Sequence, residues 1–236
     1  MFRRLVPLAP FAILVACGST AEPVAAPDTD DGGAHHHEGP SIGMDADIGA
    51  LPEGQVTATF QKSQTELGRC VDQGRTRLPY LSGTVHFKVR VGSSGKANEA
   101  HLTLSTLGDR DTEACMLGAL RSASWPEPVG GREGIAETEF TFDADGGVRM
   151  PVDWDLADAG KNVEKAKDAI RRCRSSSGAN MLVATVYVQT DGSVLSVGIS
   201  GDEGAEKAAD CVSSALKEVK FNSPGSFAAK LVLGDS

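Results

Sequence analysis

One pattern of fourteen residues occurs twice in the chain, and it constrains the fold more than any other feature. In both copies a cysteine is followed by Leu five residues later, an aromatic residue ten later and Pro thirteen later. The first copy runs from Cys115 to Pro128 and the second from Cys211 to Pro224. A fixed register over this length is typical of an internal repeat. The sequence therefore predicts a chain built twice from one structural unit.

The N-terminus has the pattern of a bacterial lipoprotein export signal. Two arginines precede a short apolar segment, which ends in a Leu-Val-Ala-Cys sequence at 14–17 that resembles a lipobox. We expect removal of a signal peptide, residues 1–16, and lipidation of Cys17. The alternative is an ordinary secretory signal with an incidental cysteine. Gly18, in place of the Asp often linked to inner-membrane retention, favours an anchor in the outer membrane, facing the periplasm.

The other four cysteines are expected to form two disulfides, because an even number of cysteines in an oxidising compartment indicates a disulfide framework. One pair within each repeat gives Cys70–Cys115 and Cys173–Cys211. Free buried thiols and a four-cysteine metal site are the alternatives. Zinc is disfavoured because the chain lacks a Cys-x-x-Cys spacing. We therefore expect neither a metal site nor a cofactor.

Hydrophobic periodicity predicts the same order of elements in both repeats: helix, strand, strand, helix, strand. In the first repeat we expect a helix capped at Thr57 or Thr59 and ending near Val71, strands at 85–91 and 97–104, a helix capped by Asp109 or Asp111, and a strand at 134–142. In the second repeat we expect a helix from Lys161, strands at 182–188 and 194–200, a helix that carries Cys211, and a strand at 227–233.

The expected fold is α+β. It consists of two tandem αββαβ units, each a three-stranded antiparallel sheet with two helices on one face and one disulfide. The first unit is expected at 56–145 and the second at 161–236. Residues 17–55 and 146–160 are rich in Gly, Asp and Pro and lack an apolar period, so they are expected to form a flexible tether and a linker.

Two groups of possible metal ligands lie in these connecting segments. The histidines at 35–37 could bind a divalent cation, and Asp153, Asp155 and Asp158 suggest a calcium loop. A histidine tract without supporting residues binds metal loosely, and the glycine and terminal glutamate of an EF-hand are missing. We therefore interpret both groups as solvated linker residues.

The repeated unit resembles the AgmX/PglI C-terminal domain family, which is related to the TonB C-terminal fold. The first repeat carries the family pattern at Cys70, Gly83, Val85 to Val91, Gly95, Cys115, Trp125 and Pro126. The second repeat carries it at Cys173, Val186, Val188, Gly192, Cys211 and Phe221, but has Asn180 in place of Gly83 and Asn222 after the aromatic residue. The resemblance implies a periplasm-facing, non-enzymatic domain of an envelope complex.

The sequence contains no recognisable catalytic motif. The only histidines outside the tether, His86 and His101, have no nucleophile or paired carboxylate that the sequence places beside them. Trp125 and Phe221 are expected in the core because they share a register. A net charge of −9 disfavours a nucleic-acid-binding surface.

We therefore expect a non-enzymatic, lipid-anchored assembly protein of the cell envelope. It would bind envelope proteins, and an uncovered sheet edge could receive an extended partner segment by strand addition. A structural spacer is one alternative. An envelope enzyme with its site between the two repeats is the other.

Overall fold

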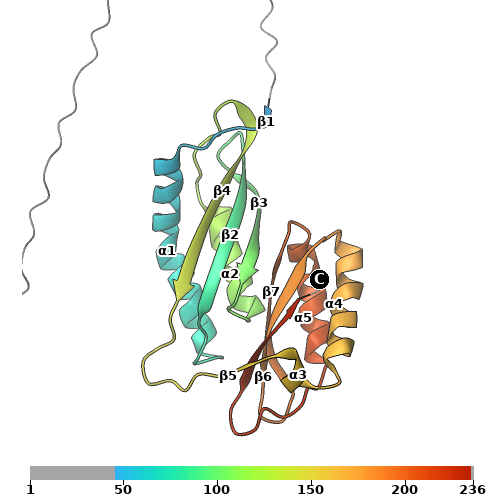
Figure 1. Cartoon of the computed structure of the whole chain (residues 1–236). Helices are drawn as coiled ribbons and strands as arrows, with labels where there is room; N and C mark the ends of the chain where they lie inside the picture. Colours follow the sequence, from blue (N-terminus) through green and yellow to red (C-terminus); the bar gives the residue numbers. More distant parts are fainter. Residues whose placement is uncertain (1–45, 235–236) are drawn as a thin grey trace, which may run out of the picture. The chain divides into compact units, whose positions relative to one another are not determined.

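The computed structural model describes residues 46–234, and it has the predicted α+β fold in two tandem repeats (Figure 1). The first repeat contains β1 (Ala46–Ile48), α1 (Glu53–Arg75), β2 (Gly83–Gly92), β3 (Ala97–Ser105), α2 (Arg110–Ser122) and β4 (Gly131–Phe142). The second contains β5 (Val152–Trp154), α3 (Leu156–Ala159), α4 (Val163–Ser177), β6 (Leu182–Val188), β7 (Val194–Gly201), α5 (Ala205–Lys217) and β8 (Ala229–Gly234). Both repeats belong to one compact unit.

Each repeat is a sheet with two long helices on one face, α1 and α2 in the first and α4 and α5 in the second (Figure 1). The strand orders are β1-β4-β2-β3 and β5-β8-β6-β7. The prediction of three-stranded antiparallel sheets is therefore wrong by one strand. Each sheet has a fourth, edge strand that runs parallel to its neighbour, and a three-residue strand is too short to show an alternating pattern.

The added strands lie in segments that were expected to be a tether and a linker. β1 and the start of α1 precede residue 56, and β5 and α3 lie within 146–160. Asp155 caps α3 by accepting hydrogen bonds from the backbone N–H groups of Ala157 and Asp158. Asp155 and Asp158 therefore organise a short helix and Asp153 lies in β5, so these aspartates do not form the predicted linker.

The first helix differs from its predicted limits at both ends. Pro52 occupies the N-cap of α1 and Arg75 is its last residue. Thr59, a predicted cap, lies inside the helix, and its hydroxyl donates a hydrogen bond to the carbonyl of Ser124. The second helix is capped as predicted, because the Asp109 side chain accepts the N–H of Thr112.

The aromatic residue of the repeated pattern closes each core. Trp125 and Phe221 are buried, and each is 5% exposed. The backbone N–H of Trp125 donates to the carbonyl of Gly95 at 3.0 Å, and the backbone N–H of Phe221 donates to the carbonyl of Gly192 at 2.9 Å. The pattern is thus a fold signature, because it joins the end of the second helix to the hairpin turn of the same repeat.

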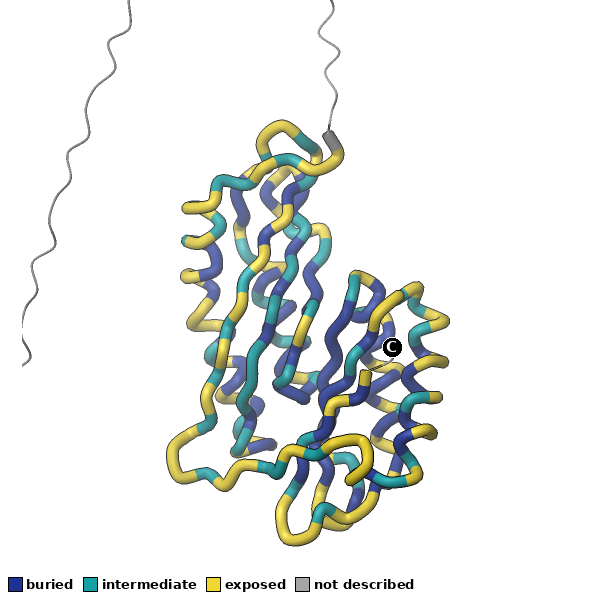
Figure 2. Tube along the Cα trace, in the orientation of Figure 1, coloured by how far each residue is buried: buried dark blue, intermediate teal, exposed yellow. Residues whose placement is uncertain are grey.

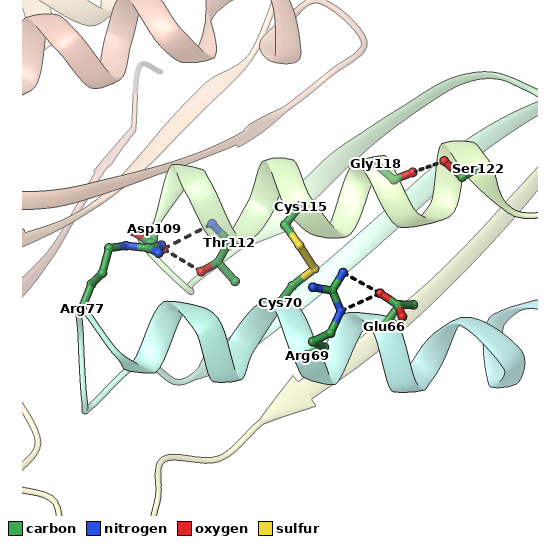
Figure 3. The surroundings of a disulfide bond; sticks show 9 residues. All are labelled: Glu66, Arg69, Cys70, Arg77, Asp109, Thr112, Cys115, Gly118 and Ser122. Carbon is green, nitrogen blue, oxygen red and sulfur yellow. Dashed lines mark hydrogen bonds and ion pairs between the residues drawn. A yellow bond between two sulfur atoms is a disulfide. The ribbon is translucent and has the colours of Figure 1, made fainter.

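The disulfides have the predicted pairing. Cys70–Cys115 joins α1 to α2 with a Cα–Cα distance of 5.8 Å (Figure 3). Cys173–Cys211 joins α4 to α5 with a Cα–Cα distance of 5.7 Å. Each bridge therefore fixes the helix pair that covers one face of a sheet.

Candidate interaction surface

The face of the second sheet that its helices leave uncovered, here called its open face, packs against the first repeat. Tyr187 on β6 is fully buried and belongs to the core of the first repeat, where its ring centroid lies 5.3 Å from that of Tyr80. The Thr185 hydroxyl donates a hydrogen bond of 3.0 Å to the carbonyl of Ser105. We call this contact between the repeats the junction.

Two buried carboxylates at the start of α2 complete the junction. Asp109 accepts a hydrogen bond of 2.7 Å from the Ser196 hydroxyl. Glu113 accepts one of 2.5 Å from Ser105 and one of 2.7 Å from the backbone N–H of Ile199. Burial raises the pKa of Glu113 to about 7. The first repeat therefore holds the second through polar groups that are removed from water.

A charged cluster, Arg90, Glu99, His101 and Glu203, lies beside the junction. Arg90 contacts Glu203 of the second repeat at 2.7 Å, and His101 Nδ1 lies 3.2 Å from a carboxylate oxygen of Glu99. Burial, and then the neighbouring Glu203, raise the pKa of Glu99 to about 7, and burial lowers the pKa of His101. The structure thus brings polar groups from both repeats close to a histidine that the sequence left isolated.

The outer edge of β4 is covered over only a short part of its length. β1 pairs with Gly131 and Glu133, and the Gly49 N–H donates to the Glu133 carbonyl at 2.6 Å. Within residues 46–234, no strand pairs with this edge beyond Glu133. Alternate residues of a strand direct their N–H and C=O groups to the same edge. The residues whose backbone groups point outward beyond Glu133 are Ile135, Glu137, Glu139 and Thr141.

The opposite edge of each sheet is formed by β3 in the first repeat and by β7 in the second. These two edges are not free in the same way, because β3 and β7 lie against each other at the junction. On the outer side of the second sheet, β5 pairs with β8 from Ala229 to Leu231, and β8 ends at Gly234. A long uncovered outer edge is therefore a feature of the first repeat.

A groove follows the β4 edge on the side of α1, with a volume of about 280 Å³. Its apolar wall consists of Val56 and Phe60 from α1 and Phe140 from β4. The Phe60 and Phe140 rings meet edge to face with their centroids 6.4 Å apart. Glu53 and Glu137 also line the groove. An extended segment paired with β4 would place alternate side chains against this wall.

Burial alternates along β2 and β4 of the first sheet (Figure 2), and the open face of these two strands carries charged side chains. Lys88 on β2 pairs with Glu137 on β4 at 3.0 Å, and His86 pairs with Glu139. The Glu137 and Glu139 side chains are 59% and 57% exposed. The His86 side chain is 41% exposed on this face. The acidic partner of each pair lies on the outer strand, beside the uncovered edge.

A larger groove, of about 820 Å³, lies between α1 and α2 beside Cys115. Two of its hydroxyl groups are bound within their own helices, since Ser63 donates to the carbonyl of Thr59. Ser122 donates to the carbonyl of Gly118 in the same way (Figure 3). Neither His86 nor His101 lines this groove or the one beside β4.

Several sequence predictions fall outside the described residues, namely lipidation of Cys17, the signal peptide, and the histidine tract at 35–37. Within residues 46–234, no group of three or more His, Cys, Asp or Glu side chains is placed to hold a metal ion. In the same part of the chain, no helix is long and apolar enough to cross a bilayer. Comparison with known proteins identified no matching family model, curated protein or solved structure.

Sequence reasoning missed most of the junction, but differences between the repeats carried a signal. Aligned by their glycine turns, Arg90 of the first repeat corresponds to Tyr187 of the second. Aligned by their cysteines, Glu113 corresponds to Ala209. A large apolar residue on an open face, and a carboxylate where the other copy has Ala, indicate that the copies have different surroundings.

Proposed function

We propose that the protein is a lipid-anchored, non-enzymatic binding protein of the cell envelope that receives an extended segment of an envelope protein at the outer edge of β4. The supporting observation is the row of outward backbone groups from Ile135 to Thr141 beside a groove with an apolar wall. Strand addition pairs such groups and places alternate side chains in adjacent pockets. The lipobox at 14–17 and the two disulfides agree with an envelope location.

Blocking the edge tests this proposal. Thr141→Pro removes an outward N–H and leaves the pairing with β2 in place, because an edge strand tolerates proline where its N–H faces solvent. Thr141→Ala is the matched control, since both variants lose the contact of 3.0 Å between the Thr84 and Thr141 hydroxyls. A photo-crosslinking residue at Ile135 should capture an envelope protein in native cells. Capture should persist in Thr141→Ala and disappear in Thr141→Pro.

Two results would contradict the proposal. One is the absence of any envelope protein crosslinked from Ile135. The other is capture that Thr141→Pro leaves unchanged. The anchor is tested in the same cells by Cys17→Ser, which should move the protein from the membrane to the soluble fraction.

A structural spacer is the second candidate function, and the buried junction favours it because it makes the two repeats one compact unit. A spacer depends on the junction and not on the β4 edge. Under this alternative, cells carrying Thr141→Pro keep an intact envelope, and cells with a disrupted junction do not.

An enzyme with its site between the repeats is the third candidate, favoured by the charged cluster around His101. Envelope function that survives His101→Gln and is lost with Thr141→Pro would exclude it.

A further inference from the structure

The two sides of the β4 edge differ in chemistry. A strand paired with this edge directs alternate side chains toward α1 and toward the open face of the sheet. On the α1 side it would meet the apolar wall of Val56, Phe60 and Phe140, and Glu53 at the start of α1 also lines this groove. Val56 and Phe140 are partly exposed, so this wall still has apolar surface to bury. The positions of a bound segment that face α1 are therefore matched by apolar residues.

The open-face side of the same edge is acidic. Glu137 and Glu139 point to this side, where directly opposed residues of a paired strand have Cβ atoms roughly 4.5–5.5 Å apart. The side chains that pair with them, Lys88 and His86, lie on β2, one strand further into the sheet. Residues 133–142 contain no Lys or Arg. A bound strand would therefore meet carboxylates whose partner side chains lie on the far side, on β2.

A second copy of this chain is a poor match for the edge. Pairing β4 with β4 of another copy would set Glu137 and Glu139 opposite the same acidic residues, and like charges across a strand pair are destabilising. β1 already occupies the edge at Gly131 and Glu133, which limits an added strand to the stretch from Ile135 to Phe142. The edge fits a short segment of a different protein.

We infer that the segment bound at the β4 edge alternates apolar and basic residues. Its apolar side chains enter the groove beside α1, and its Lys or Arg side chains lie over Glu137 and Glu139. This inference rests on the proposed function, and it specifies the chemical class of the partner segment.

Three labelled six-residue peptides test the inference by fluorescence anisotropy with the full chain. One alternates Val and Lys, one alternates Val and Glu, and the third has the Val–Lys composition with its three Lys together. The Val–Lys peptide should bind about tenfold more tightly than the Val–Glu peptide, because opposite charges replace like charges at two positions. The block peptide should bind more weakly than the alternating one. Amide NMR signals of Ile135, Glu137, Glu139 and Thr141 should shift on binding.

Charge variants locate the effect. The double variant Glu137→Gln and Glu139→Gln should lose the preference for Val–Lys over Val–Glu. The control Glu66→Gln and Glu164→Gln makes the same change in net charge on exposed helix positions and should keep the preference. Thr141→Pro should abolish binding of the alternating Val–Lys peptide.

The outcomes separate this inference from the proposed function. Equal binding of the two alternating peptides, or a preference that persists in the double glutamine variant, overturns the inference alone. So does tight, Thr141→Pro-sensitive binding of the Val–Glu peptide. Crosslinks between the β4 strands of two copies would identify a self-associating edge and overturn it as well. Peptide binding that Thr141→Pro leaves intact removes the edge as the site, and the proposed function with it.

Discussion

Glu113 is completely buried, and its carboxylate is bound by neutral donors, the Ser105 hydroxyl and the Ile199 N–H. Burial raises its pKa from an ordinary 4.5 to about 7. The folded chain thus binds this proton more tightly than the unfolded chain does. The contribution of Glu113 to stability is therefore full below about pH 4.5 and is lost as the pH rises to about 7.

Replacing Glu113 by Gln should remove this pH dependence. Above pH 7 the variant should be more stable than the wild type by up to about 3 kcal/mol, because no charge is then buried. Below pH 4.5 the two should be similar. Urea unfolding at about pH 4 and about pH 8 measures the difference. Glu99 titrates in the same window, so the variant flattens the pH profile only in part.

A matched control is Glu164→Gln on the exposed face of α4, which should leave the pH profile of stability unchanged. A Glu113→Gln variant that is less stable than the wild type at both pH values would contradict the assignment. It would show that the two hydrogen bonds of the carboxylate outweigh the penalty for burying its charge.

Residue roles were predictable where local chemistry determines them. Asp109 was found as a cap because a carboxylate before a helix binds free N–H groups there. Tyr187 and Glu113 were not found. Alternation along a strand or helix shows which face a side chain is on, but not which distant surface covers that face.

At the scale of elements, the two helix pairs rely on their disulfides. Cys70 and Cys115 are separated by 45 positions in sequence, and Cys173 and Cys211 by 38. Closing a loop of either size removes conformations from the unfolded chain and stabilises the fold by about 4 kcal/mol in the chain-entropy model. The bridges therefore supply a large part of the stability of each small repeat.

Replacing Cys70 and Cys115 together by Ser should lower the free energy of unfolding by about 4 kcal/mol. The corresponding double variant at Cys173 and Cys211 should show a loss of similar size, because its loop has a similar length. Guanidinium unfolding of each variant under the same conditions measures both losses. A loss below about 1 kcal/mol would show that the helix pairs are held by packing alone.

The long elements were predictable because their patterns extend over several turns or alternations. β2 alternates buried and partly exposed residues over most of its length, and this pattern was read correctly. β1 and β5 have three residues each and owe their conformation to pairing with β4 and β8. The start of α1 was misplaced because Pro52, which offers no side-chain oxygen as a cap, precedes it. The position of the candidate binding edge depends on where β1 ends. The sequence therefore predicted an uncovered sheet edge, but not which strand would carry it.

At the scale of the whole molecule, the junction depends on a close approach between the repeats. A Cβ atom at Gly198 would lie 2.7 Å from the Gly108 Cα and would also collide with the Glu113 carboxylate. Gly198 faces Thr185 on the neighbouring strand, so it lies on the open face that the first repeat covers. Any side chain at position 198 would push β7 away from Gly108 and Glu113 of the first repeat.

Gly198→Ala should weaken the junction by about 1–3 kcal/mol, the usual effect of overpacking. Amide hydrogen exchange should rise for β7 and for the start of α2. Gly118→Ala on α2 is the matched control, because its Cβ would meet no atom within 4 Å. The control should be slightly stabilised, since Ala favours a helix over Gly. Unchanged exchange at β7 in Gly198→Ala would show that the repeats are not coupled there.

The different open faces of the two sheets fix the order of the halves. The second sheet offers Thr185 and Tyr187 to the start of α2, and Lys88 and Arg90 occupy the corresponding positions of the first sheet. A chain with its halves exchanged would have to bury those cations, and the start of α5 has Ala209 where α2 has Glu113. The order of the two repeats is therefore specified by the side chains of their open faces and not by the fold that they share.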